Sequence, residues 1–262
     1  KIKKGNKEKT LNTILLVEDN KEIRNFIKLI LGDLYTIYTA NNGVKGLKIA
    51  NNKHIDFIIS DVMMPEMDGL EFCKHIKKEI NTSHIPFVII SARTETKDKV
   101  EAYKLGVDAY LTKPFNKQEL LLIIKNLLEK KQKQISFLSK LLHLRNNHKE
   151  VPDINELDLT LIKNIQEVAL DNNKQMSIEE LAQSLYTSRS QLHNKVKSLT
   201  GMSITNYMNH IRIEKAKYLL KTTQLNISEI AYDVGFTSSN YFARSFKKIT
   251  NTSPATYKQI HS

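Results

Sequence analysis

The sequence contains a single cysteine, Cys73, and lacks any run of apolar residues close to the roughly 18 that a membrane helix requires. One cysteine excludes an internal disulfide framework and a metal site built from cysteines. The basic leader, residues 1–10, is not followed by the apolar stretch and small-residue cleavage site of a signal peptide. We therefore expect a cytoplasmic protein with no membrane contact in this part of the chain. The missing initiator methionine is consistent with a piece of something longer.

Positive charge is in excess, but it is distributed unevenly along the chain. Residues 11–130 carry 17 Lys and Arg against 16 Asp and Glu, a net charge of +1, whereas residues 131–262 carry 18 against 11, a net charge of +7. A neutral front half and a basic back half predict a polyanion-binding module at the C-terminal end. The alternative is a general enrichment in lysine from an AT-rich genome, which the many Asn, Ile and Lys residues also suggest.

In the first 130 residues, short apolar runs alternate with amphipathic segments. Three of the runs are almost continuously apolar, which is typical of strands buried on both faces of a parallel sheet. The alternation predicts an α/β domain over residues 11–130, with a doubly wound, five-stranded parallel sheet. The expected strands are 14–17, 35–39, 57–60, 87–90 and 109–111, and the expected helices lie near 21–31, 43–51, 67–79, 97–105 and 116–130.

The second half has no strand pattern and contains an internal repeat. Residues 131–156 are interpreted as a linker, because the helical pattern is broken at 145–152, and residues 157–262 show only helix and turn patterns. Each copy of the repeat follows a polar residue able to cap a helix, and a turn with a second amphipathic helix comes after it. An all-α domain with two helix-turn-helix units is therefore predicted. The repeated residues are Ile178, Leu181, Ala182 and Leu185, and, 49 residues later, Ile227, Ile230, Ala231 and Val234.

Polar residues stand at the carboxyl ends of the predicted strands, where a doubly wound sheet forms its active crevice. Glu18 and Asp19 follow the first strand, Asp61 ends the third, Ser91 ends the fourth and Lys113 follows the fifth. Three converging carboxylates would repel one another without a hard divalent cation, and ligation by oxygen alone suits Mg²⁺. A lysine and a hydroxyl opposite them provide the cation and the hydrogen-bond donor that an aspartyl phosphate needs.

These residues stand within motifs that resemble the signature set of bacterial receiver domains, which have a flavodoxin-like fold. The resemblance covers roughly residues 11–130. The motifs are 14–20, ILLVEDN; 61–69, DVMMPEMDG; Ser91-Ala92; and Lys113-Pro114-Phe115.

The resemblance implies a role for each residue of the set. Asp61 is the phosphoacceptor, supplied by a histidine kinase, and Ser91 and Lys113 contact the phosphate. Glu18, Asp19 and Asp61, with the main-chain carbonyl of Met63, hold Mg²⁺, and Tyr110 is the aromatic switch. Taken singly, each has a plainer interpretation: an Asp after a strand is usually a helix cap, a Lys-Pro a turn, and Tyr110 edge-strand packing. Cys73 is expected to be a buried apolar residue and not a redox site.

Residues 177–257 resemble the AraC-type transcription factor domain, in which one long helix holds two helix-turn-helix units. The residues that carry the resemblance are 177–182, SIEELA; 188–192, SRSQL; 199–201, LTG; 226–231, NISEIA; 234–236, VGF; Tyr241-Phe242; 246–248, FKK; and Ser253-Pro254. A connecting helix at about 204–221 spans roughly 27 Å at 1.5 Å per residue. That length places two recognition helices in successive major grooves on one face of DNA.

Helical spacing separates an inner from an outer side in each recognition helix. Leu192, Val196 and Leu199 form the inner stripe of the first, and Phe242, Phe246 and Ile249 that of the second. The outward residues are candidates for DNA contact, since Arg can read guanine, Asn can read adenine, and Lys and Ser suit phosphates. For Lys197 and Lys247 an ordinary solvated helix face is the alternative, and His193 could equally pack. The candidates are Arg189, Ser190, His193, Asn194, Lys197, Ser239, Asn240, Arg244 and Lys247.

Three functions compete for this sequence. The first is a phosphorylation-controlled, sequence-specific transcription regulator that binds DNA, forms a homodimer when phosphorylated and, as the family resemblance suggests, activates transcription. The second is the C-terminal part of a hybrid sensor with a histidine kinase ahead of residue 1. The third, an enzyme of haloacid-dehalogenase type, requires a second Asp two residues after Asp61. Met63 stands there instead, so we expect no enzyme.

Overall fold

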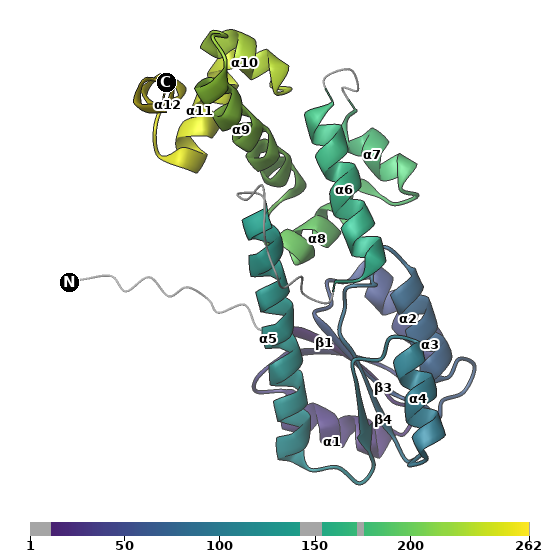
Figure 1. Ribbon diagram of the computed structural model, residues 1–262. Helices are drawn as coiled ribbons and strands as arrows, with labels where there is room; N and C mark the ends of the chain where they lie inside the picture. The colour runs from purple at the N-terminus through teal and green to yellow at the C-terminus, as the bar shows by residue number, and fades with distance from the viewer. Residues whose placement is uncertain (1–11, 142–153, 172–175, 262) are drawn as a thin grey trace, which may run out of the picture. The chain divides into compact units, whose positions relative to one another are not determined.

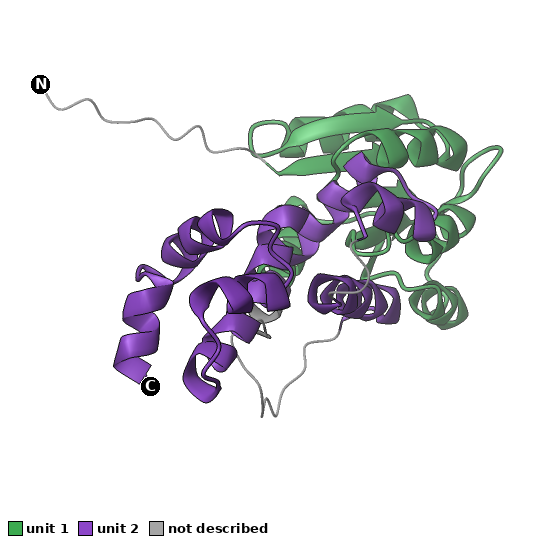
Figure 2. Ribbon diagram, turned by 90° about the horizontal axis from the view of Figure 1, so that it is seen from above, with its two compact units in different colours: residues 1–132 green, residues 133–262 purple. Residues whose placement is uncertain are grey.

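The computed structural model describes residues 12–141, 154–171 and 176–261, which form two compact units, 1–132 and 133–262 (Figures 1 and 2). The predicted leader, 1–10, and most of the second half of the predicted linker lie outside the described residues. The boundary between the units falls within one helix, α5, Lys117–Leu141. Each unit is described by itself below.

The first unit is a five-stranded, wholly parallel sheet with the strand order β2-β1-β3-β4-β5, as the alternating pattern predicts. Its strands end next to one another, because Val17 of β1 is paired with Ser60 of β3, and Ser91 of β4 with Thr112 of β5. The strands are β1 (Thr13–Val17), β2 (Thr36–Ala40), β3 (Phe57–Asp61), β4 (Phe87–Ser91) and β5 (Ala109–Thr112).

Helices cover both faces of this sheet (Figure 1). The helices α1 (Lys21–Leu31) and α5 lie on one face, over a core that includes Ile27, Phe57 and Ile124. The other face carries α2 (Gly43–Asn52), α3 (Gly69–Lys78) and α4 (Thr96–Lys104), over a core that includes Phe72 and Phe87. The central strands are buried on both sides, which explains why their sequences are nearly continuous apolar runs.

The helix α5 continues past residues 131–134, where the sequence already indicated helix, to residue 141, within the range 131–156 interpreted as the linker. Residues 131–141 are helical, and they contain no glycine or proline that would end a helix. The Nζ atom of Lys131 lies 3.4 Å from the Oδ1 atom of Asp56 and contacts the Asp56 carbonyl oxygen at the same distance. This contact attaches the helix to the residue before β3.

The second unit is helical within its described residues, and its two helix-turn-helix copies begin alike. Ser177 and Glu180 form a reciprocal capping box at the start of α7, and Asn226 and Glu229 form the same device at the start of α10. The repeat seen in the sequence is therefore a structural repeat. Its helices are α6 (Glu156–Leu170), α7 (Ile178–Ser184), α8 (Arg189–Thr200), α9 (Ile204–Thr222), α10 (Ile227–Asp233), α11 (Ser239–Thr250) and α12 (Pro254–His261).

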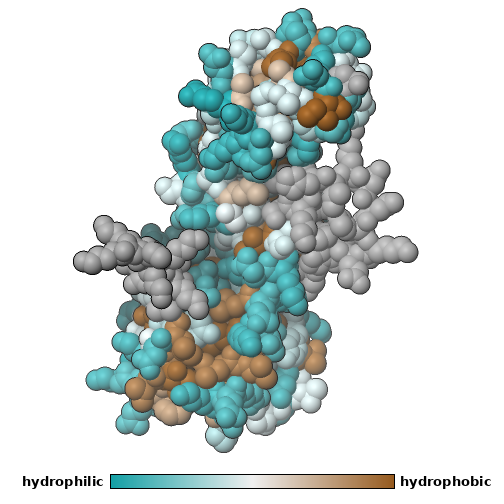
Figure 3. Space-filling view, turned by 90° about the vertical axis from the view of Figure 1, so that its left-hand side faces the viewer, coloured by the Kyte–Doolittle hydropathy of each residue, from teal (hydrophilic) through white to brown (hydrophobic). Residues whose placement is uncertain are grey.

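Apolar side chains gather on one face of the first unit, as the lower part of Figure 3 shows. On the helices that cover this side of the sheet, the exposed apolar residues are Phe26 and Leu29 of α1 and Leu122 of α5.

Among the described helices, none is both long and apolar enough to cross a membrane.

Candidate functional site

Three carboxylates meet at the carboxyl edge of the sheet. Glu18 and Asp19 come directly after β1, and Asp61 is the last residue of β3. One oxygen atom from each carboxylate lies within 4.8 Å of the others, so the strand ends bring together the acidic residues that the sequence singled out. Glu18 and Asp61 are buried, whereas Asp19 is exposed.

Lys113, which follows β5, closes this cluster from the other side. Its Nζ atom lies 2.8 Å from the Oδ2 atom of Asp61 and 2.9 Å from the Oε2 atom of Glu18. Burial alone would lower the pKa of Lys113, but its hydrogen bonds to the two carboxylates outweigh that effect and raise the pKa above its usual value. Burial raises the pKa of Glu18, and the nearby Asp61 charge adds to the rise, while Lys113 opposes it.

The Asp61 carboxylate is oriented by the chain that follows it. Its Oδ1 atom accepts hydrogen bonds from the backbone amides of Val62, at 2.6 Å, and Met63, at 3.4 Å, which leaves Oδ2 for Lys113. Gly69 makes this loop possible, because a Cβ atom there would lie 1.9 Å from the Asp61 carbonyl oxygen. A side chain at position 69 would thus displace the backbone that carries the site.

The donor set of this cluster suits a hard divalent cation. Glu18, Asp19 and Asp61 offer only carboxylate oxygens, which Mg²⁺ prefers to nitrogen or sulfur ligands. Burial raises the pKa of Glu18, and a cation bound beside it would oppose that rise. The residues present therefore fit a magnesium ion.

Arg93 connects the rim of the pocket with the predicted switch residue. Its backbone amide donates to the Oγ atom of Ser91 at 3.1 Å, and its carbonyl accepts from the Tyr110 hydroxyl at the same distance. The Arg93 guanidinium contacts the Met63 sulfur at 3.1 Å and lies 3.7 Å from Asp98 of α4. Ser91 and Tyr110 are thus both attached to one residue at the mouth of the site, whose side chain reaches α4.

Three residues that the sequence reasoning did not single out shape the loops of the pocket. The Nδ2 atom of the buried Asn42 donates to Glu66 at 2.7 Å, and Glu66 adopts a left-handed backbone conformation with φ of 66° in the loop after β3. Arg24 of α1 donates to the carbonyl oxygens of Glu18, at 2.5 Å, and Asp19, at 3.1 Å. The sequence gives no signal for these contacts, because a glutamate at position 66 does not indicate a left-handed backbone.

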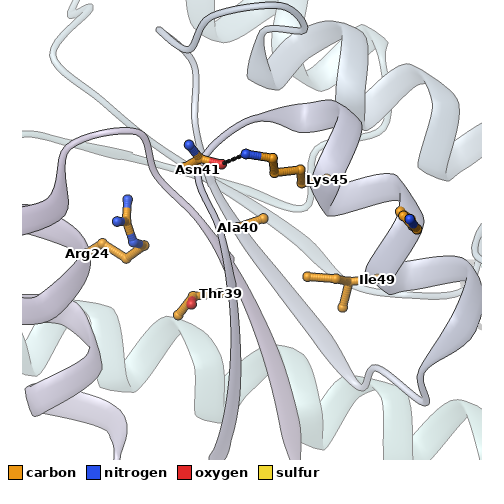
Figure 4. A pocket seen from close by; sticks show the side chains of 7 residues that line it. Arg24, Thr39, Ala40, Asn41, Lys45 and Ile49 are labelled. Atoms are coloured by element: carbon orange, nitrogen blue, oxygen red, sulfur yellow. Dashed lines mark hydrogen bonds between the residues drawn. The ribbon is translucent and has the colours of Figure 1, made fainter.

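A separate pocket of about 420 Å³ lies beside β2 and α2, and Figure 4 shows its lining. Arg24, Lys45 and Lys48 surround it together with Asn41, and Lys45 donates to Asn41 at 2.9 Å. This lining contains no carboxylate, so the pocket is distinct from the acidic cluster.

In the second unit, the two predicted recognition helices present the residues that their spacing indicates. Leu192, Val196 and Leu199 of α8 are buried, as are Phe242 and Phe246 of α11. The exposed candidates are Arg189, Ser190, Asn194, Lys197, Asn240, Arg244 and Lys247, while His193 and Ser239 are half-buried. The nine residues predicted to contact DNA therefore lie at the surface or partly so.

The Arg189 side chain is engaged within its own helix-turn-helix unit. It forms an ion pair with Glu179 of α7. A contact of Arg189 with a base would require this pair to open or to be shared. Arg244 of α11 is exposed, and no such pair is recorded for it among the described residues.

Polar contacts that the sequence reasoning missed hold both recognition helices and join α9 to α6. Lys195 of α8 is buried and lies 2.6 Å from Asp158 of α6. The Nδ2 atom of Asn209 on α9 donates to the Tyr241 hydroxyl at 2.8 Å, and Arg212 of α9 donates to the Ala169 carbonyl at 3.1 Å. The burial of Lys195 could have been read from the sequence, because it stands on the inner side of α8, three residues after Leu192.

Two family models match the chain. The model of the response regulator receiver domain matches residues 14–125, and a model described as a helix-turn-helix domain matches residues 181–260. The first contains the acidic cluster and Lys113, and the second contains α8 to α11.

Known proteins are similar to long stretches of this chain. Histidine kinase P4 of Formosa agariphila is 40% identical over 257 residues, which is 97% of this chain and 18% of that protein. The chain thus spans less than one fifth of the length of this relative. Response regulator ArlR of Staphylococcus epidermidis is 30% identical over 210 residues, 79% of this chain and 94% of that protein. A CheY-like receiver domain protein from Methanospirillum hungatei is 27% identical, with a TM-score of 0.45, and covers 47% of this chain and 98% of that structure.

The strand-end cluster lies in the part that matches receiver domains, and the paired recognition helices lie in the part that matches a helix-turn-helix domain. A response regulator is matched over nearly its whole length. The chain belongs to the response regulators, with a receiver domain followed by an AraC-type helix-turn-helix domain.

Proposed function

We propose that this chain is a phosphorylation-controlled, sequence-specific DNA-binding transcription regulator whose phosphoacceptor is Asp61. The observation that carries the proposal is the position of Lys113 Nζ, 2.8 Å from Asp61 and 2.9 Å from Glu18, inside a cluster of three carboxylates. Asp61 is the carboxylate of this cluster that is buried, oriented by two backbone amides and paired with the lysine. The role is regulatory and not enzymatic.

In the proposed reaction an oxygen of Asp61 attacks the phosphorus of a phosphohistidine. A phosphorus–oxygen bond forms, the phosphorus–nitrogen bond breaks, and the imidazole nitrogen takes up a proton. Lys113 is placed to remain beside the transferred group, where its charge stabilises the phosphoryl oxygens. Glu18, Asp19, Asp61 and the main-chain carbonyl of Met63 would hold Mg²⁺, which supplies further positive charge to those oxygens.

The contacts of Arg93 support a switch that involves Ser91 and Tyr110. The Arg93 amide already donates to the Ser91 oxygen, so the Ser91 hydroxyl can turn its proton toward a phosphoryl oxygen. If Ser91 moves toward the phosphate, Arg93 moves with it and withdraws the carbonyl that accepts from Tyr110. Tyr110 then loses its outer partner and turns inward. The proposed output is dimerisation through the receiver face that bears Tyr110 and α5.

The output would reach DNA through α8 and α11. The connecting helix α9 has 19 residues and spans about 28 Å at 1.5 Å per residue, close to the ~34 Å of one helical turn of DNA. Arg189, Ser190, His193, Asn194 and Lys197 of α8, and Ser239, Asn240, Arg244 and Lys247 of α11, are the proposed contacts. The net charge of +7 over residues 131–262 supports binding to a polyanion.

The phosphoryl donor is proposed to be a histidine kinase, either a separate protein or part of the same polypeptide. A relative named as a histidine kinase contains a stretch that is 40% identical to nearly all of this chain, which supports the second arrangement. We further propose an activator of transcription that acts in the cytoplasm, where bacterial DNA is accessible.

Labelling by a small phosphodonor tests the acceptor. Asp61→Asn should abolish incorporation of phosphate from radiolabelled acetyl phosphate in the presence of Mg²⁺, because it removes the attacking carboxylate and keeps the size of the side chain. Asp33→Asn, which changes an exposed carboxylate in the same unit, should label like the wild type. Labelling that survives in the Asp61→Asn variant would move the acceptor elsewhere, with Asp19 the next candidate.

A further inference from the structure

The turn of the first helix-turn-helix unit carries a tyrosine at a position where the second unit carries glycine. Tyr186 and Gly235 both donate their backbone amides to a carbonyl three residues back, at 3.0 Å, in the turn after α7 and α10 respectively. The following residues, Thr187 and Phe236, also make matching bonds at 3.0 Å, to Ala182 and Ala231. The two turns therefore have the same hydrogen-bond pattern, and Tyr186 occupies the place of Gly235.

This position requires a left-handed backbone. Gly235 has φ of 91° and Tyr186 has φ of 52°. Glycine adopts such angles without steric penalty, whereas a bulky side chain with positive φ is an outlier that the rest of the fold must hold in place. In the second helix-turn-helix copy a side chain would also be crowded, because a Cβ atom at position 235 would lie 3.1 Å from the Arg212 side chain. The backbone of the turn thus favours glycine in both helix-turn-helix copies.

Packing within the chain does not explain the tyrosine either. The Tyr186 side chain is 99% exposed, and no hydrogen bond, ion pair or ring contact joins it to a described residue. The chain consequently keeps a strained backbone and a fully exposed aromatic ring at a site where glycine would relieve both. A strained residue whose side chain has no contact within the described chain points to a partner outside the chain.

The place of Tyr186 in the motif indicates what that partner is. It lies two residues before Ser188, the N-cap of α8, and three before the exposed Arg189. In a helix-turn-helix the first helix crosses the DNA backbone and the second enters the major groove with its N-terminal residues. The turn between them therefore faces the phosphates at the rim of the groove, and tyrosine is among the side chains that donate to phosphate oxygens.

We propose that Tyr186 is a DNA-backbone contact of the first helix-turn-helix unit, in which its hydroxyl donates to a phosphate and its ring packs on the adjoining sugar. The inference rests on the proposed DNA-binding function. It implies that the two helix-turn-helix copies contact DNA differently. The first copy adds a phosphate contact at its turn, and the second copy, which has Gly235 there, does not.

Substitution of Tyr186 separates this role from a structural one. The probe is a duplex selected by the wild-type full chain from a random DNA library. Tyr186→Gly should raise the unfolding temperature of the helical domain, residues 133–262, by about 3–8 °C, because it relieves the backbone strain. The same substitution should weaken the Kd for the duplex roughly 10-fold, because it removes both the hydrogen bond to the phosphate and the packing of the ring on the sugar.

Conservative and control variants sharpen the test. Tyr186→Phe keeps the ring and the backbone conformation, so it should leave the unfolding temperature unchanged and weaken binding about 5-fold. The loss should be equal on selected and scrambled duplexes, with no change in the salt dependence, because the tyrosine carries no charge. Tyr103→Phe, which changes an exposed tyrosine on α4 of the receiver domain, should bind within 2-fold of the wild type.

Each outcome decides one question. If the wild-type chain binds the duplex and both Tyr186 variants bind it with the same Kd, the proposed contact is overturned and the proposed DNA-binding function stands. Unchanged Kd with loss of transcription from a promoter that carries the duplex would assign Tyr186 to a protein partner and overturn the DNA contact. A wild-type chain that selects no duplex would overturn the proposed function and this inference with it. A Tyr186→Gly protein that unfolds at or below the wild-type temperature would refute the strain argument.

Discussion

Removal of Asp158 should destabilise the second unit far more than an ordinary surface substitution. Asp158 lies on α6, outside the residues matched by the helix-turn-helix model, and its Oδ1 atom is 2.6 Å from Lys195 Nζ on α8. The Lys195 and Asp158 side chains are only 1% and 4% exposed. Asp158→Ala would therefore remove a negative charge from beside a lysine that water does not reach.

The expected size follows from that burial. Breaking a buried ion pair by removing one partner costs about 3–5 kcal/mol, because the remaining charge is left without compensation. At roughly 3–5 °C per kcal/mol for a unit of this size, the unfolding temperature should fall by ~10–20 °C. Replacing both residues with apolar ones, Asp158→Leu with Lys195→Met, should restore most of the loss, since pairs of this kind can be exchanged for hydrophobic packing.

Thermal unfolding of the full chain, followed by circular dichroism, measures these shifts. The matched control is Glu95→Ala, which removes a pair of similar length, 2.8 Å to Lys97, in which both side chains are largely exposed. It should change the stability of the first unit by no more than about 0.5 kcal/mol. A loss below ~1 kcal/mol for Asp158→Ala, or a double variant as unstable as the single one, would refute the reasoning.

Four further outcomes are expected. Met63→Asn should shorten the lifetime of phosphoryl-Asp61 several-fold, because the Met63 thioether cannot orient a water for in-line attack and Arg93 cannot act as a base; loss of label within seconds from the wild type would contradict this. Arg244→Ala should weaken DNA binding by about 1–3 kcal/mol and relax discrimination at one base position, whereas equal weakening on all sequences would make it a phosphate contact. Beryllofluoride should convert the wild-type chain to a dimer in sedimentation experiments, and a chain that stays monomeric at high micromolar concentration would favour release of an inhibitory contact between domains. Burial raises the pKa of the Cys73 thiol to about 12, so iodoacetamide should label it at pH 8 only as the first unit unfolds, and rapid labelling of the native protein would show the burial to be wrong.

The receiver pocket could be predicted from the sequence because the sheet is parallel. Once five strands are recognised, their carboxyl ends must share an edge, so Glu18, Asp61 and Lys113 converge without any knowledge of side-chain conformation. The buried faces of α8 and α11 were equally accessible, since a helical period fixes which residues point inward. Both predictions depend on periodicity, which a sequence displays directly.

The contacts that modify these sites depend on details that periodicity does not contain. The spacing of Arg93 from Met63 in the chain gives no hint that the guanidinium contacts the thioether sulfur at 3.1 Å. The left-handed turn at Tyr186 is hidden because tyrosine is an unexpected residue there, and only comparison with Gly235 in the other unit reveals it. The contact of Lys131 with Asp56 joins residues 75 positions apart, and nothing in the local sequence indicates it.

Two lysines, the half-buried Lys113 and the buried Lys195, form ion pairs of similar length that have different consequences. Lys113 is 17% exposed and has two carboxylate partners, so a phosphoryl oxygen can replace one of them without leaving the lysine uncompensated. Lys195 is 1% exposed and is sealed against Asp158, so exchange of its partner would leave a charge in an apolar interior. A lysine that can change partners at low energetic cost can respond to phosphorylation, and one that cannot will hold a helix in place. The access of solvent therefore distinguishes the two lysines: the partly exposed Lys113 can exchange one partner for another, whereas the buried Lys195 holds α8 against α6.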